Sequence, residues 1–169
     1  KKKYIILMKL SFITLTNDGN KEFTENCLVS LKKIGIESLK VYCIDQKSFD
    51  YLSPKFNNII KMNLKDEEIE SNLVNFRRGN WSKIVLKKFN IIYEELQNND
   101  YVLFTDGDIV YIRNGFIEYC LENIGDADII MQDDRINDQP VNNIQVQNIQ
   151  EICSGFMLIK KNQEMLKLF

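Results

Sequence analysis

The chain has 169 residues, of which 44% are hydrophobic and 27% charged, with a net charge of −2 and no histidine. That length fits one domain, the charge gives no basic surface for nucleic acid, and no apolar run reaches the roughly 18 residues of a membrane span. The absence of histidine excludes Ser-His-Asp and Cys-His catalysis and the His-based zinc proteases, so we expect any metal site to consist of carboxylate oxygens.

Strand and helix patterns alternate along the chain. In the first part, the sequence predicts a strand over 4–16, a helix over 23–34, a strand over 39–44, a short helix over 48–52 and a strand over 58–62. In the second part, it predicts a long helix over 80–96, strands over 101–105 and 109–112, a helix over 116–124, a strand over 129–132, a polar loop over 133–150, a strand over 153–160 and a helix from 163.

This order predicts an α/β fold with a mostly parallel sheet and helices on both faces. Ligands of such sheets bind beyond the carboxyl ends of the strands. Three polar strand ends should therefore meet at one edge: residues 14–17, Asp45, and the turn Asp106-Gly107-Asp108.

The sequence contains two Asp-x-Asp triplets, and their contexts differ. Asp126-Ala127-Asp128 follows a predicted helix and is typical of a solvated connection, whereas the turn at 106–108 lies between two apolar runs. Two carboxylates at this spacing can hold one hard divalent cation, which then acts as a Lewis acid. A simple Asp-Gly hairpin turn is the alternative, and context alone leaves both interpretations open.

Basic residues precede this turn in the sequence. Lys83, in the first turn of the long helix, and Arg78 just before it could add positive charge to an anion site. A surface lysine whose stem packs on the protein is the alternative for Lys83.

The four cysteines are widely spaced and form no CxxC pair. Each lies in an apolar pattern, which favours buried free thiols over a metal site or a disulfide framework. We therefore expect a cytoplasmic or otherwise reducing compartment.

Several segments together resemble the nucleotide-diphospho-sugar transferases of the GT-A (Rossmann-like) fold. Residues 81–114 combine a helix with a lysine near its start, an apolar strand, a DxD motif and a second apolar segment. Residues 127–134, 153–160 and 12–19 match the family's pattern in order and spacing, so the resemblance spans nearly the whole chain. It implies a single GT-A-like nucleotide-sugar-binding domain over 1–169.

The resemblance also implies roles for individual residues. Asp106 and Asp108 would be the ligands of Mn²⁺ or Mg²⁺ and, with Asp133, the catalytic carboxylates. The donor would be bound by Thr14, Leu15, Thr16, Asn17, Asp45, Arg78, Lys83, Asp106 and Gly107. The pocket for the transferred sugar or the acceptor would include Gln132, Asp134, Ser154 and Gly155.

Two departures from the family pattern limit what the resemblance implies. Family members commonly supply a further metal ligand, often histidine, and continue into an acceptor-binding segment; this chain has no histidine and ends at Phe169. A fragment truncated at its C-terminus, a minimal domain and a chain completed by another segment are the alternatives.

The leading hypothesis is a metal-dependent glycosyltransferase that moves a sugar from a nucleotide-diphosphate donor, such as a UDP-sugar, to a hydroxyl of a glycan, protein or small molecule. A non-catalytic nucleotide-sugar-binding module with the same fold is the alternative. A sugar-1-phosphate nucleotidyltransferase is disfavoured, because residues 16–20 lack the Gly-rich basic phosphate loop of those enzymes.

Overall fold

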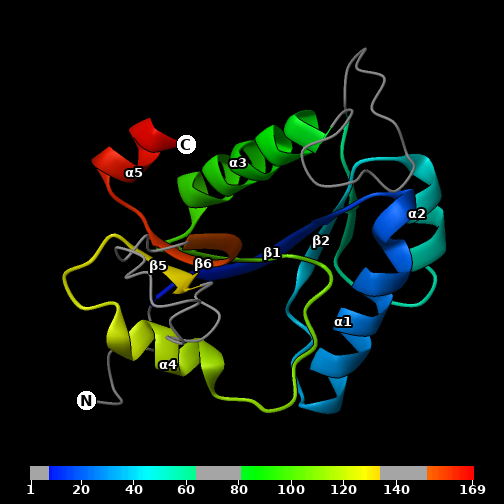
Figure 1. Ribbon diagram of the computed structural model, residues 1–169, viewed down its shortest axis with the longest axis horizontal. Coiled ribbons are helices and arrows are strands. Elements are labelled where there is room, and N and C mark those ends of the chain that lie inside the picture. Colours follow the sequence, from blue (N-terminus) through cyan, green and yellow to red (C-terminus); the bar gives the residue numbers. More distant parts are fainter. Residues whose placement is uncertain (1–7, 64–80, 134–151) are drawn as a thin grey trace, which may run out of the picture.

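The computed structural model describes residues 8–63, 81–133 and 152–169, and its centre is a six-stranded sheet (Figure 1). The sheet order is β3-β2-β1-β4-β6-β5. The pairs β3–β2, β2–β1 and β1–β4 are parallel, while β6 runs antiparallel to both β4 and β5. The strands are β1 (Leu10–Thr16), β2 (Lys40–Cys43), β3 (Ile59–Lys61), β4 (Tyr101–Thr105), β5 (Ile129–Asp133) and β6 (Ile152–Lys160).

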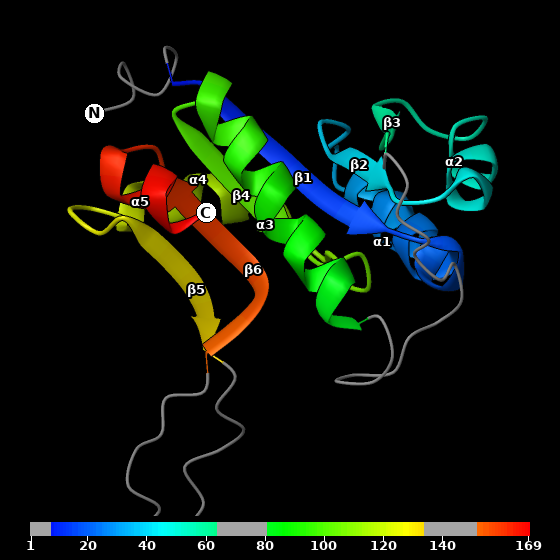
Figure 2. The same cartoon turned by 90° about the horizontal axis from the view of Figure 1, so that it is seen from above.

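Helices cover both faces of this sheet, which confirms the predicted α/β class (Figure 1). One apolar cluster joins one face to α1, α2 and α4, and a second cluster joins the other face to α3 and α5. Figure 2 shows α3 lying across β1 and β4, the two central strands. The helices are the 3-10 helix η2 (Asp18–Asn20), α1 (Lys21–Lys33), α2 (Gln46–Leu52), α3 (Trp81–Asn98), α4 (Phe116–Asn123) and α5 (Gln163–Leu168).

The local signals in the sequence explain most of these boundaries. All five residues of β4 are buried, as its unbroken apolar run requires for a strand covered on both faces. Helix α1 ends where Gly35 adopts φ +82, a left-handed conformation that glycine accepts without steric cost. Asp45 caps the start of α2, and its carboxylate accepts the backbone N–H of Ser48 at 2.8 Å.

The predicted strand over 109–112 is wrong, because within the described residues this segment pairs with no strand. Its position is set instead by Tyr111, whose backbone N–H donates to Ser30 Oγ at 3.0 Å. The Tyr111 ring stacks on Phe116 with centroids 4.6 Å apart, and its hydroxyl donates to Thr105 Oγ1 at 2.8 Å. A short apolar run therefore occurs here in a loop, with one inward aromatic side chain between exposed neighbours and no strand ladder.

Three of the four cysteines are buried free thiols, as predicted. Burial raises the pKa of Cys27 to about 12 and that of Cys43 to about 11, so both stay protonated at neutral pH. Cys153, on β6, differs from the prediction because it is only partly buried. In the described part of the chain, no helix is both long and apolar enough to cross a membrane.

Some predicted segments lie outside the described residues. They are the start of the first strand (4–7), the acidic stretch 66–70 and most of the polar loop (134–150).

Candidate functional site

The acidic turn Asp106-Gly107-Asp108 directly follows β4, at the carboxyl end of a central strand. The backbone N–H of Asp106 donates to the carbonyl oxygen of Gly155 on β6 at 2.7 Å, which continues the β4–β6 pairing by one step. Asp108 is exposed and Asp106 is partly buried. The turn is thus anchored on one side and open to solvent on the other.

Lys88 of α3 forms an ion pair with Asp106, with Nζ 3.0 Å from Oδ1. The lysine is only 8% exposed; its ammonium also donates to the carbonyl oxygen of Ser154 at 3.1 Å and lies 4.5 Å from the ring centre of Phe104. Desolvation raises the pKa of Asp106 above its usual value; Lys88 opposes the rise and the nearby Asp108 adds to it. The site therefore pairs a partly desolvated carboxylate with one buried ammonium group.

Lys88 is a residue of the candidate site that sequence reasoning missed. Lys83, which was predicted to add positive charge for the donor, is exposed in the first turn of α3, and the ion pair to Asp106 comes from Lys88. The difference follows from helical geometry, because Lys88 shares the sheet-facing stripe with Ile91 and Glu95, whereas Lys83 lies off it. The sequence does contain a signal for Lys88, because this charged residue falls at the helical spacing of the buried residues of α3.

Both glycines of the site are required by close packing. A Cβ on Gly107 would lie 2.4 Å from Thr24 Oγ1, and one on Gly155 would lie 2.9 Å from Asp106 Oδ2. Gly107 does not have a positive φ, so it is not the left-handed residue of an Asp-Gly hairpin. Thr24 of α1 occupies the side of Gly107 on which a Cβ would lie, and Gly107 also lines the hollow beside the turn.

The polar residues after β1 and after β2 lie together as predicted, and hydrogen bonds hold them in place. Asn17 is buried, and its Oδ1 accepts the backbone N–H of Asn20 at 3.1 Å. The carboxylate of Asp45 accepts two backbone N–H groups at 2.8 Å each, one from Asp18 and one from Ser48. Asp45 therefore links the loop after β1 to the start of α2.

The predicted donor-binding residues of β1 have different positions in the structure. Thr14 is fully buried within the strand, and the Thr16 hydroxyl accepts a hydrogen bond from Thr24 at 2.8 Å. Leu15 is partly exposed and borders the acidic turn. Of these three side chains, Leu15 is the one that faces the candidate site.

On the other side of the turn, β6 has an irregularity that shapes the site. The register of β5 with β6 shifts between Met131 and Gln132, so Gln132 pairs with Cys153. The shift leaves Ser154 and Gly155 out of the β5 ladder, where their carbonyls meet Lys88 and Asp106. Gln132 and Asp133 are exposed at the end of β5. Arg78 and Asp134, also predicted site residues, lie outside the described residues.

A hollow of about 120 Å³ lies against the acidic turn. Its lining residues come from the end of β1, the start of α1 and the turn itself: Leu15, Asn20, Phe23, Asp106, Gly107 and Asp108. Within the described residues, no group of three or more Cys, Asp or Glu side chains is arranged to hold a metal ion. The turn therefore presents two carboxylates beside an open hollow.

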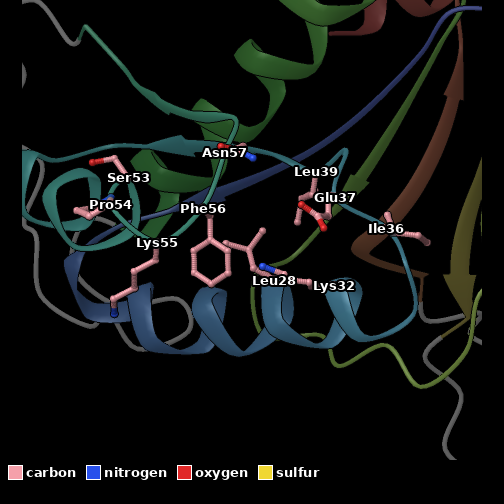
Figure 3. A pocket seen from close by; sticks show the side chains of 10 residues that line it. All are labelled: Leu28, Lys32, Ile36, Glu37, Leu39, Ser53, Pro54, Lys55, Phe56 and Asn57. Carbon is pink, nitrogen blue, oxygen red and sulfur yellow. The ribbon is translucent and has the colours of Figure 1, made fainter.

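A second hollow, of about 150 Å³, lies at the opposite end of α1 (Figure 3). Figure 3 shows the Phe56 ring between α1 and the loop that leads to β3, with lysine side chains at the rim. Its lining, taken over the described residues, includes no aspartate, and it is remote from the acidic turn, so we place the candidate site at 106–108. The lining residues are Leu28, Lys32, Ile36, Glu37, Leu39, Ser53, Pro54, Lys55, Phe56 and Asn57.

Sheets with a parallel core bind ligands beyond the carboxyl ends of their strands, and this chain carries the acidic turn at such a position. Residues 35–169 match the family model described as nucleotide-diphospho-sugar transferase, and the chain belongs to this family.

Two relatives are similar over most of the chain. A UDP-galactose:fucoside alpha-3-galactosyltransferase from Dictyostelium discoideum is 24% identical over 180 residues, which cover 92% of this chain and 27% of the relative. The crystal structure of the galactosyltransferase LgtC, in complex with donor and acceptor sugar analogs, superposes with a TM-score of 0.58 at 13% identity, and the match covers 93% of this chain and 58% of LgtC. The second match shows a shared GT-A fold, and the chain spans only part of each relative.

Proposed function

We propose that the chain binds a nucleotide-diphosphate sugar at the acidic turn and acts as a metal-dependent glycosyltransferase toward an acceptor hydroxyl. The observation that carries the proposal is the pair Asp106 and Asp108 at the carboxyl end of β4, with Asp106 held by Lys88 at 3.0 Å. Family membership and the LgtC-like fold support a nucleotide-sugar donor.

The residues of the turn fit a divalent cation. Two carboxylates at i and i+2 are hard oxygen ligands of the kind that Mn²⁺ and Mg²⁺ prefer, and Asp108 is exposed. Asp106 and Asp108 would hold the ion, which when bound supplies a Lewis acid for the leaving diphosphate. The described residues contribute two ligands, so donor oxygens and water would complete the coordination.

Lys88 has two roles in this proposal. It opposes the desolvation that raises the pKa of the Asp106 carboxyl, and it orients the carboxylate through an ion pair at 3.0 Å. Because Lys88 also binds the Ser154 carbonyl, α3, β4 and β6 meet at one ammonium group. The geometry of the acidic turn is thus fixed before a donor binds, which lowers the cost of binding.

Activity against UDP-galactose tests the proposal, since the name of the Dictyostelium relative points to this donor and to a fucoside acceptor. We expect Mn²⁺-dependent release of UDP that falls at least tenfold in Asp108→Ala. Asp126→Ala is the matched control, because Asp126 lies in the other Asp-x-Asp triplet and is also exposed. Equal loss in both variants would contradict the assignment.

A non-catalytic nucleotide-sugar-binding module is the second candidate. It is favoured by one observation: within the described residues no third Cys, Asp or Glu joins Asp106 and Asp108 in a metal-binding group. The two candidates share donor binding and differ in turnover. Any Asp108-dependent release of UDP would exclude the binding module, whereas tight Mn²⁺-dependent UDP binding with no release, with or without acceptor, would favour it.

A further inference from the structure

Tyr111 is the inward side chain of the loop that follows the acidic turn. It is partly buried, whereas its neighbours Val110 and Ile112 are 54% and 87% exposed. Its ring stacks on Phe116 with centroids 4.6 Å apart and meets the edge of Phe12 at 6.2 Å. Packing accounts for the ring but not for the hydroxyl, because a phenylalanine would make the same ring contacts.

The Tyr111 hydroxyl begins a chain of two hydrogen bonds that leads back to the acidic turn. It donates to Thr105 Oγ1 at 2.8 Å, and the Thr105 hydroxyl donates to the carbonyl oxygen of Asp106 at 3.2 Å. A hydroxyl has one hydrogen, so Thr105 gives its own to Asp106 and accepts that of Tyr111. Burial raises the pKa of Tyr111, which keeps this donor protonated at neutral pH. Thr105 is fully buried, so water does not compete for either bond.

This chain of bonds closes the loop that carries the two carboxylates. The loop is held at its start, where the Asp106 backbone N–H donates to Gly155, and at its end, where the Tyr111 backbone N–H donates to Ser30 Oγ at 3.0 Å. Among the described residues, those between these two anchors make no backbone hydrogen bond with another segment. Asp108 lies between them and is exposed, so its place relative to Asp106 depends on how the loop ends are held.

Tyr111 and Lys88 restrain the turn from opposite faces of the sheet. Lys88 belongs to α3 and binds the Asp106 carboxylate, whereas Tyr111 packs in the cluster that includes α1 and α4. Through Thr105, Tyr111 acts on the backbone of Asp106 instead of its side chain. The two restraints therefore act on different atoms, and Tyr111 alone joins the two ends of the loop.

We propose that the Tyr111 hydroxyl is a positioning group for the metal site: through Thr105 it fixes the spacing of Asp106 and Asp108 before a cation binds. This inference rests on the proposed function, since it requires a divalent cation at the acidic turn. Groups that orient metal ligands without touching the metal set the affinity of a site, because a misplaced ligand binds the ion less well.

The Mn²⁺ concentration that gives half-maximal UDP binding, measured by calorimetry on the full chain, tests the proposal. Tyr111→Phe keeps the ring and removes the hydroxyl, and it should raise this concentration about tenfold. Tyr51→Phe is the matched control and should leave it unchanged. Tyr51 is also a partly buried tyrosine, but its hydroxyl donates to Glu25, and neither residue borders the hollow beside the acidic turn.

Variants of Thr105 test the same chain of bonds at its middle. Thr105→Val removes the hydroxyl and should raise the Mn²⁺ requirement as much as Tyr111→Phe does. The double variant should lose no more than either single variant, because both changes break one chain. Thr105→Ser keeps a hydroxyl and should stay within about twofold of the wild type. Additive losses in the double variant, or equal Mn²⁺ requirements in Thr105→Ser and Thr105→Val, would overturn the assignment.

Urea unfolding separates positioning from a purely structural role. Both tyrosine variants lose a hydroxyl hydrogen bond, so both should show a lower urea midpoint, and only Tyr111→Phe should need more Mn²⁺. A lower midpoint in Tyr111→Phe with an unchanged Mn²⁺ requirement would overturn the inference alone. Wild-type UDP binding that does not depend on Mn²⁺ would contradict the proposed function itself.

Discussion

Replacement of Gly107 by alanine tests how tightly α1 constrains the acidic turn. The added Cβ would lie 2.4 Å from Thr24 Oγ1, a distance that real contacts do not reach. Thr24 cannot easily yield, because it is fully buried and its hydroxyl donates to Thr16 at 2.8 Å. Overpacking of this kind costs about 1–3 kcal/mol, and we expect Gly107→Ala to lower the free energy of unfolding by about 2 kcal/mol.

The contact can be removed from the other side. Thr24→Ala deletes the oxygen at 2.4 Å, after which the new methyl on residue 107 meets Thr24 Cβ and Cα positions at 3.4 and 3.6 Å, which are ordinary contacts. The lost hydrogen bond to Thr16 should cost about 1 kcal/mol. In the Thr24→Ala background, Gly107→Ala should then cost less than about 0.5 kcal/mol, which leaves a coupling of at least about 1.5 kcal/mol.

Urea unfolding followed by circular dichroism measures all four members of this double-mutant cycle. The midpoints should change while the slopes stay the same, since the exposed surface of the unfolded state is unaltered. If the stability losses of the two single variants simply add, with a coupling below about 0.5 kcal/mol, the conclusion that Thr24 requires a glycine at position 107 is refuted.

Three further predictions concern charge and thiol chemistry. Lys88→Met should raise the pKa of Asp106 further, because the Lys88 ammonium lowers it in the wild type. Mn²⁺-dependent UDP binding should then weaken at least tenfold and begin at a higher pH than in the wild type. Calorimetry across a pH series measures both changes. Desolvation alone would raise the pKa of Glu95, but its hydrogen bonds, chiefly with Lys40 at 2.8 and 2.9 Å, bring it below its usual range. Glu95 should therefore stabilise the fold above about pH 4.5, and this stabilisation should disappear as the pH falls through its lowered pKa. In urea titrations, Glu95→Gln should be less stable than the wild type by about 1–2 kcal/mol at neutral pH, and it should not show the loss of stability that the wild type shows at acid pH. Maleimide labelling of the native chain should modify Cys153 first, because the other three thiols are buried, and Cys153→Ser should remove this fast phase in mass spectrometry.

Most of the fold could be predicted because its signals are local. Apart from η2 and the start of β1, sequence patterns located the described elements to within a few residues, and β4 matched its predicted range of 101–105. The prediction for 109–112 failed because a short apolar run occurs both in strands and in loops with one inward side chain, here Tyr111. The antiparallel direction of β6 also had no local signal, since pairing direction depends on how the chain returns.

The candidate site was predictable in part. Its location at the strand ends followed from the topology of parallel sheets, and Asp106 and Asp108 lie where that rule places them. The choice of Lys88 over Lys83 depends on which side of α3 faces the sheet, which a fixed offset from the helix start does not give. The exposure of Phe23 likewise depends on how α1 packs against the turn, a three-dimensional fact that helical spacing does not contain.

The role of the acidic turn is tested most sharply by titrating UDP into the chain with and without Mn²⁺, compared among the wild type, Asp108→Ala and Asp126→Ala. We predict that wild-type binding requires Mn²⁺, that Asp108→Ala weakens it at least tenfold, and that Asp126→Ala leaves it unchanged. Binding of UDP that is independent of Mn²⁺, or equally strong in Asp108→Ala, would contradict the assignment of the acidic turn as a metal-diphosphate site.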